Sequence, residues 1–86
     1  MPGDLVLIHG AGPIGMIICD MAEALGATVI VSEVNEARLE IAKSFGAKYT
    51  INPQKRDLRE AVMDITDGKG VNVVFETSGI PALTSL

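Results

Sequence analysis

Aromatic side chains are scarce in this chain, which contains two phenylalanines, one tyrosine and no tryptophan. The hydrophobic content is nevertheless 48%, so most of it is aliphatic, as expected of strands that helices cover on both faces. No apolar run reaches the roughly 20 residues that a membrane-spanning helix needs. We therefore expect a small α/β protein that has no membrane partner.

Basic residues are too few and too scattered to form a nucleic-acid surface. Seven lysines and arginines are outnumbered by eleven acidic residues, and the formal net charge is −4. The densest basic stretch, Lys55 to Arg59, is interrupted by Asp57 and followed by Glu60. Because no basic stripe could follow a phosphate backbone, we expect no nucleic-acid partner.

Cysteine and histidine each occur once, as Cys19 and His9. Together they fall short of the three or four ligands of a zinc site, so the sequence predicts no metal ligands in this chain. We expect His9 to have a structural role, and Cys19 to lie off the apolar face of its helix without a reactive role. The chain would therefore contain no catalytic residue. No basic leader precedes the first predicted strand, so we expect a cytoplasmic protein.

Strand-like and helix-like hydrophobic patterns alternate along the chain. Short β-branched and apolar runs predict strands at residues 5–9, 28–32, 48–51 and 71–76. Helical spacing predicts a helix in each gap, and a glycine follows each helix. This order predicts an α/β doubly wound parallel sheet of about four strands, in the spatial order 3-2-1-4, with helices on both faces. Residues 1–86 would form one partial domain of this kind.

The apolar residues of each predicted helix form a stripe that we expect to face the sheet. In the first helix, the stripe consists of Ile14, Ile17, Ile18, Met21, Ala22 and Leu25. In the second, which Asn35 would cap, it consists of Ala37, Ile41, Ala42 and Phe45. In the third, which Asp57 would cap, it consists of Leu58, Ala61, Val62 and Ile65.

The first predicted strand runs directly into a G-x-G-x-x-G pattern that also opens the first helix: Gly10, Ala11, Gly12, Pro13, Ile14 and Gly15. Many loops contain this pattern by chance, but its place between a buried strand and an amphipathic helix is what dinucleotide binding requires. Gly10 permits the tight turn, Gly12 lets the backbone approach a pyrophosphate, and Gly15 allows the helix to pack closely. Pro13 suits the first helical position. The helix N-terminus would face the phosphates. A turn without a ligand is the alternative.

Glu33 follows the second predicted strand, 18 residues after Gly15, where an acid can accept hydrogen bonds from the adenosine ribose. The same carboxylate would repel a 2′-phosphate, so the sequence predicts NAD rather than NADP as the cofactor. A solvated carboxylate at the end of the strand is the alternative. An acid at this position also occurs in domains that bind other nucleotides, such as S-adenosylmethionine.

Three segments together resemble the cofactor domain of the zinc-dependent medium-chain alcohol and polyol dehydrogenases, the group of sorbitol and threonine dehydrogenases. These segments are residues 2–15 with the glycine pattern, residues 37–47, and the Phe-Glu-Thr-Ser-Gly run at 75–79. The resemblance implies a Rossmann-like fold and an oxidoreductase that transfers hydride from an alcohol to NAD. It also implies that the zinc and the catalytic residues belong to a separate domain outside this chain, so the chain would not be catalytic alone.

The resemblance further implies roles for residues outside the glycine pattern. Glu33 would hold the adenosine ribose, Arg38 would lie beside it, and Val34 would contact one face of the adenine. For Arg38, a solvated helix position is an equal alternative. The residues that would line the crevice between the first and fourth strands are Thr77, Ser78 and Gly79.

The fourth predicted strand is apolar and would lie at the edge of the sheet. Such edges recruit further strands, so we expect a homo-oligomer formed through this edge. The alternative function for the chain is therefore an oligomerising Rossmann-like fragment with no useful ligand binding.

Overall fold

The computed structural model of the protein describes residues 2–77. Four strands and three helices alternate along this part of the chain: β1 (Leu5–His9), α1 (Pro13–Ala24), β2 (Thr28–Ser32), α2 (Glu36–Ser44), β3 (Tyr49–Ile51), α3 (Leu58–Ile65) and β4 (Val73–Glu76). The predicted element order is confirmed. β3 begins one residue later than predicted and β4 begins two residues later.

The strands form one parallel sheet in the order β3-β2-β1-β4, as the alternating pattern predicts. β1 lies between β2 and β4, with Leu7 opposite Ile30 on one side and Val74 on the other. All three pairs are parallel, so the carboxyl ends of the strands meet at one edge. The glycine turn and Glu33 follow β1 and β2 at this edge.

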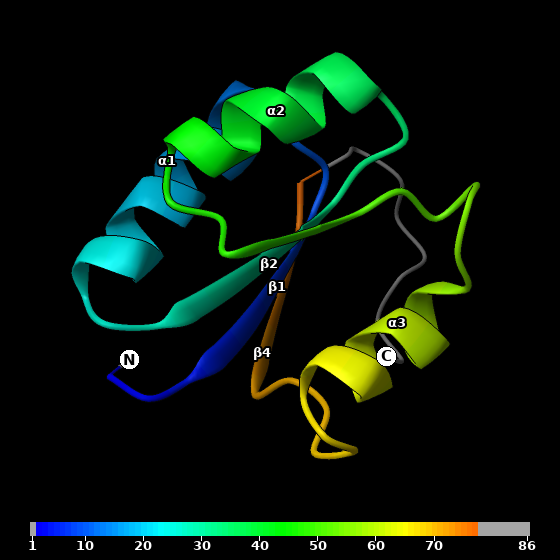
Figure 1. Ribbon diagram of the computed structural model, residues 1–86. Coiled ribbons are helices and arrows are strands. Elements are labelled where there is room, and N and C mark those ends of the chain that lie inside the picture. Colours follow the sequence, from blue (N-terminus) through cyan, green and yellow to red (C-terminus); the bar gives the residue numbers. More distant parts are fainter. Residues whose placement is uncertain (1, 78–86) are drawn as a thin grey trace.

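Helices cover both faces of the sheet, with α1 and α2 on one face and α3 on the other (Figure 1). The alternation of side chains along the strands divides the core between the two faces. Under α1 and α2, the strand residues of the core are Val6, Ile8, Val29 and Val31. Under α3, they are Leu7, Ile30 and Ile51.

The predicted inward stripe of α1 is largely wrong. Ile14, Ile17, Met21 and Leu25 are 56–67% exposed, and only Ala22 of the six predicted residues is fully part of the core. The buried face of α1 consists of Gly15, Met16, Cys19 and Ala22. These residues are mostly small because the helix packs very close to the strand-to-helix turn, where a Cβ at Gly15 would lie only 2.3 Å from the carbonyl oxygen of Gly10. The large apolar side chains of the predicted stripe lie on the exposed side of the helix.

The stripe of α2 is also partly wrong, whereas that of α3 is confirmed. Ala42 is buried in α2 as predicted, but Leu39 is its other buried residue, and Ile41 and Phe45 are 49% and 41% exposed. Ala37 is exposed as well. In α3, two of the predicted residues are buried and two are partly buried: Ala61, Val62, Leu58 and Ile65. No helix within residues 2–77 has the length and apolarity needed to cross a bilayer.

Two of the three helices begin at the predicted side-chain caps. The Asn35 side chain accepts a hydrogen bond from the Arg38 N–H at 3.1 Å, and the Asp57 side chain accepts one from the Glu60 N–H at 2.9 Å. Such caps stabilise helix starts by about 1 kcal/mol each. α1 differs, because Gly12 precedes it and supplies no side-chain cap.

Candidate functional site

The glycine turn is fixed to the carboxyl edge of the sheet by hydrogen bonds from both neighbouring strands. The Gly10 N–H donates to the Ser32 carbonyl at 2.8 Å. On the β4 side, the Thr77 hydroxyl donates to the Gly10 carbonyl at 2.9 Å, and the Thr77 N–H donates to the His9 carbonyl at 2.9 Å. Gly10 has φ +109°, a conformation that L side chains rarely adopt. The turn is therefore a rigid structure with a backbone that needs glycine.

The other two glycines of the pattern have opposite surroundings. A Cβ at Gly15 would lie 2.3 Å from the Gly10 carbonyl oxygen and 2.7 Å from the Thr77 hydroxyl. A Cβ at Gly12 would meet no atom within 4 Å, and the φ of Gly12 is an ordinary −77°. The fold itself thus requires glycine at position 15 and does not require it at position 12. Open space at Gly12 is what a group that approaches the backbone would need.

Glu33 links the glycine turn to the start of α2. One carboxylate oxygen accepts a hydrogen bond from the Ala11 N–H at 2.9 Å, and the other accepts one from the Asn35 N–H at 3.0 Å. The side chain is only 10% exposed. Both oxygens keep a second lone pair for a further donor. The carboxylate is therefore already oriented beside the turn.

The pKa of Glu33 lies below its ordinary value of 4.5. Burial acts in the opposite direction and would raise this pKa, but the N–H groups of Asn35 and Ala11 and the charge of Arg38 outweigh it. The Arg38 guanidinium lies 3.9 Å from the Glu33 carboxylate and is 54% exposed, so the ion pair is loose. Glu33 is accordingly ionised at neutral pH.

The start of α1 is electrically unlike the starts of the other helices. α2 and α3 have a capping side chain and an acidic residue, Glu36 or Glu60, in the first turn. α1 has neither. Its first N–H groups and the positive end of its dipole therefore have no capping or acidic side chain within the helix itself, an arrangement that favours an anion.

A groove of about 430 Å³ between α1 and α2 brings several predicted site residues together. Gly12, Pro13 and Arg38 line one part of it, and the remaining lining residues are Ala11, Met16, Ile17, Ile41 and Phe45. Ile14 and Val34 are not in this lining, and they are 67% and 49% exposed. Ser78 and Gly79 lie outside the described residues.

The sequence did not identify the backbone groups that organise the site. The N–H groups of Ala11 and Asn35 hold the Glu33 carboxylate, but no side-chain pattern marks a backbone donor. The hydroxyl of Thr77 was predicted to line the crevice; its observed bonds are to the carbonyls of His9 and Gly10. A threonine directly after an apolar strand is the one sequence signal that could have indicated this anchor.

Cys19 is buried, which corrects its predicted place off the packed face of α1. Its thiol lies 3.6 Å from the Phe45 carbonyl. Burial, followed by the negative charges of Asp20 and Glu23, raises the pKa of this thiol to about 11. The thiol is thus protonated at neutral pH and is a poor nucleophile.

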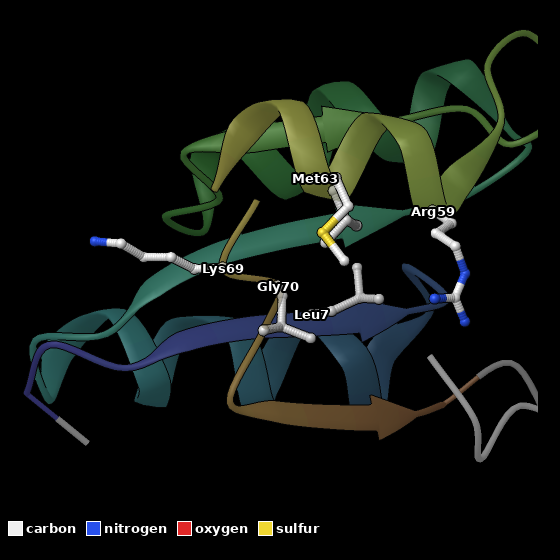
Figure 2. A pocket seen from close by; sticks show the side chains of 7 residues that line it. Leu7, Arg59, Met63, Lys69 and Gly70 are labelled. Atoms are coloured by element: carbon white, nitrogen blue, oxygen red, sulfur yellow. The ribbon is translucent and has the colours of Figure 1, made fainter. Parts of the chain in front are cut away.

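A separate cavity of about 190 Å³ lies under α3, away from the glycine turn. Figure 2 shows Leu7 and Met63 in its middle, while the Arg59 and Lys69 side chains extend toward opposite ends. None of the predicted site residues lines it. Within residues 2–77, no group of three or more His, Cys, Asp or Glu side chains could hold a metal ion.

Residues 13–86 match the family model described as zinc-binding dehydrogenase. The chain belongs to this family. It corresponds to a segment of the NAD-binding domain of zinc-type alcohol and polyol dehydrogenases. The predicted family resemblance is thereby confirmed.

Individual dehydrogenases match nearly the whole of this chain. The L-threonine 3-dehydrogenase of Pyrococcus horikoshii is 54% identical over 80 residues, which are 92% of this chain and 23% of the relative. The sorbitol dehydrogenase of Bacillus subtilis is 43% identical over 82 residues, or 94% of this chain and 23% of the relative. An alcohol dehydrogenase structure from Thermotoga maritima superposes with a TM-score of 0.85 at 38% identity and covers 93% of this chain and 23% of its own. The chain thus spans about a quarter of the length of these relatives.

Proposed function

We propose that this chain binds the adenosine diphosphate portion of NAD. The main support for this proposal is Glu33. Its carboxylate is nearly buried, and two backbone N–H groups orient it beside the start of α1, which has no side-chain cap. Its oxygens have remaining capacity for the two ribose hydroxyls, and the N–H groups at the start of α1 suit the pyrophosphate. The open space at Gly12 would let the pyrophosphate approach the backbone.

The same geometry supports a preference for NAD over NADP. A 2′-phosphate would have to lie against the ionised Glu33, whose side chain is too enclosed to be screened well. Arg38 would offset part of this repulsion, but its guanidinium is already 3.9 Å from the same carboxylate. The proposed residues are those of the glycine pattern, Gly10 to Gly15, with Glu33, Val34, Arg38 and the segment 77–79.

In a protein of the relatives' length, the proposed activity is the oxidation of an alcohol to a carbonyl by hydride transfer to NAD. The catalytic zinc and the groups that bind the alcohol would belong to a separate domain, because residues 2–77 hold no metal-ligating cluster. A cytoplasmic location is part of the same proposal.

A ¹⁵N NMR titration with NAD, NADP and ADP-ribose in parallel tests the binding proposal. We expect NAD and ADP-ribose to shift the amide signals of Gly10, Gly12, Gly15 and Glu33, and NADP to shift them less at equal concentration. In Gly12→Ala, which the fold accommodates, we expect a native-like spectrum and at least tenfold weaker ADP-ribose binding. A dispersed wild-type spectrum that does not respond to millimolar ADP-ribose would refute the proposal.

The second candidate function is self-association through β4. This strand lies at the end of the sheet and pairs only with β1 among the described strands, and all four of its residues are partly exposed. Such an edge offers unpaired backbone groups to a second copy of the chain. The mass of the protein in solution tests this candidate, independently of any ligand.

A further inference from the structure

The segment between β2 and α2 carries Glu33, and the end of β3 holds this segment in place. Ile51, the last residue of β3, is the register partner of Ser32. Its carbonyl accepts a hydrogen bond from the Glu33 N–H at 3.0 Å. Asn52 follows directly and is half-buried. Its side chain contacts the segment 33–36, although Asn52 belongs neither to the glycine pattern nor to the lining of the groove between α1 and α2.

The side-chain amide of Asn52 uses each of its polar groups. Its oxygen accepts a hydrogen bond from the Gln54 N–H at 2.9 Å. Its nitrogen donates to the Val34 carbonyl at 3.2 Å and to the Glu36 carboxylate at 2.6 Å. A flipped amide would place its oxygen against two acceptors, so these partners fix the orientation of the group.

The bond from Asn52 to Val34 reaches Glu33 through a single peptide group. The Val34 carbonyl and the Asn35 N–H belong to the same trans, planar peptide, so they point in opposite directions. The carbonyl accepts the bond from Asn52, and the N–H donates to the Glu33 carboxylate at 3.0 Å. Rotation of this peptide would turn the N–H away from the carboxylate. The amide of Asn52 therefore opposes the rotation that would release Glu33.

We propose that Asn52 is a positioning residue for nucleotide binding: through the Val34–Asn35 peptide, it holds the Glu33 carboxylate in the orientation that the ribose hydroxyls require. This inference rests on the proposed function and adds a residue that does not touch the nucleotide. Without Asn52, Glu33 keeps its bond from the Ala11 N–H, so the carboxylate loses orientation but stays in place. A less oriented carboxylate binds the ribose more weakly and can also turn away from a 2′-phosphate.

Asn52→Ala removes the bond to the 34–35 peptide and provides the first test. We expect the pKa of Glu33, followed by carboxyl ¹³C NMR, to rise toward 4.5, because that peptide holds the ionised form less well. We expect ADP-ribose to bind about fivefold more weakly, since roughly one net hydrogen bond is lost. The preference for NAD over NADP should narrow, whereas a merely structural loss would weaken both cofactors equally.

Asn72→Ala is the matched control. The side chain of Asn72 also bonds to the backbone, accepting from the Leu5 N–H at 2.7 Å, but it does so at the amino ends of β1 and β4. Its removal should leave the pKa of Glu33 and the affinity for ADP-ribose unchanged. An equal effect of Asn72→Ala and Asn52→Ala on these two quantities would overturn the inference.

A charge-neutral double variant isolates the bond to Val34. In Asn52→Asp combined with Glu36→Gln, the new glutamine amide can donate to the new aspartate, so the bond between these two positions is kept with its direction reversed. The aspartate has no donor for the Val34 carbonyl. We expect the same changes as in Asn52→Ala, whereas Glu36→Gln alone should leave the pKa of Glu33 and the affinity unchanged.

The outcomes separate this inference from the proposed function. If either Asn52→Ala or the double variant folds and matches the wild type in the pKa of Glu33 or in the affinity for ADP-ribose, the inference is overturned. The proposed function then still stands, provided that the wild type binds ADP-ribose. If the wild type does not bind ADP-ribose, the proposed function itself fails, whatever the pKa of Glu33 in the variants.

Discussion

Gly12 and Gly15 lie in the same turn, yet their surroundings predict opposite effects of an added methyl group on stability. Gly15→Ala places a Cβ against the Gly10 carbonyl and the Thr77 hydroxyl, and such overpacking costs about 1–3 kcal/mol. Gly12→Ala meets no neighbouring atom, so we expect its unfolding free energy to stay within about 1 kcal/mol of the wild type. Urea unfolding measures both. Equal destabilisation by the two changes would contradict the described packing.

The lowered pKa of Glu33 makes stability depend on pH in a defined range. A carboxylate whose folded pKa lies below its unfolded value contributes stability at neutral pH, and this contribution is lost as the pH falls through about 4.5 and below. We expect Glu33→Gln to unfold about 1–2 kcal/mol more easily at pH 7. The difference in unfolding free energy between Glu33→Gln and the wild type should shrink below pH 4.

Unfolding at a series of pH values checks this expectation. Glu40→Gln is the control, since the side chain of Glu40 is 71% exposed and its ion pair with Lys43 lies on the surface. If the unfolding free energies of Glu33→Gln and the wild type differ by the same amount down to pH 3, the charge of the carboxylate does not contribute to stability.

The position of Glu33 could be predicted from the sequence, but its surroundings could not. An acid at the end of the second strand of a β-α-β unit has a defined place relative to the first turn. Its observed partners are the N–H groups of Ala11 and Asn35. These donors become available only through the turn geometry, which residue identity does not specify.

At the level of elements, α1 illustrates the limits of hydrophobic periodicity. Ile14, Ile17, Met21 and Leu25 have helical spacing, but they are exposed. Periodicity measures how apolar each side of a helix is, whereas close contact with a sheet selects small residues such as Gly15. α3 lies on the other face of the sheet, away from the glycine turn. Its apolar stripe was predicted correctly.

Met16 and Met21 provide a matched test of which side of α1 is buried. Met16 is 5% exposed and Met21 is 58% exposed, in the same helix. We expect Met16→Ala to lower the unfolding free energy by about 2–4 kcal/mol, because it leaves a cavity. Met21→Ala should change it by less than about 1 kcal/mol. Thermal or urea unfolding of the two variants distinguishes the faces. A larger loss of unfolding free energy in Met21→Ala than in Met16→Ala would indicate that the buried face of α1 is the one that periodicity predicts.

At the level of the whole molecule, the order of elements predicted a parallel sheet with right-handed crossovers. Doubly wound sheets of this kind occur in more than one strand order, and the predicted order β3-β2-β1-β4 is the observed one. The strand lengths were less predictable. Val71 extends the β-branched pattern before Asn72, but the β4 ladder with β1 begins at Val73, opposite Val6. Pairing partners, which are remote in sequence, decide where a strand begins.

The edge position of β4 predicts the association state. We expect light scattering at high protein concentration to give a mass near twice the 9.0 kDa of the chain, and β4 amides to exchange more slowly as the concentration rises. The exposed amides of α3 serve as an internal control. A mass of one chain at every concentration would rule out pairing through β4.

The bonds of Thr77 to the glycine turn have a consequence for the order in which the protein is made. The Gly10 carbonyl and the Thr77 hydroxyl are separated by 67 positions in the chain, so a ribosome completes nearly the whole of the described segment between them. Until then, β1 has a neighbour on the β2 side alone, and the turn is held only through Ser32 and Glu33. The glycine turn is thus synthesised well before Thr77, and it acquires its contacts with Thr77 only after nearly the whole of the described segment has been made.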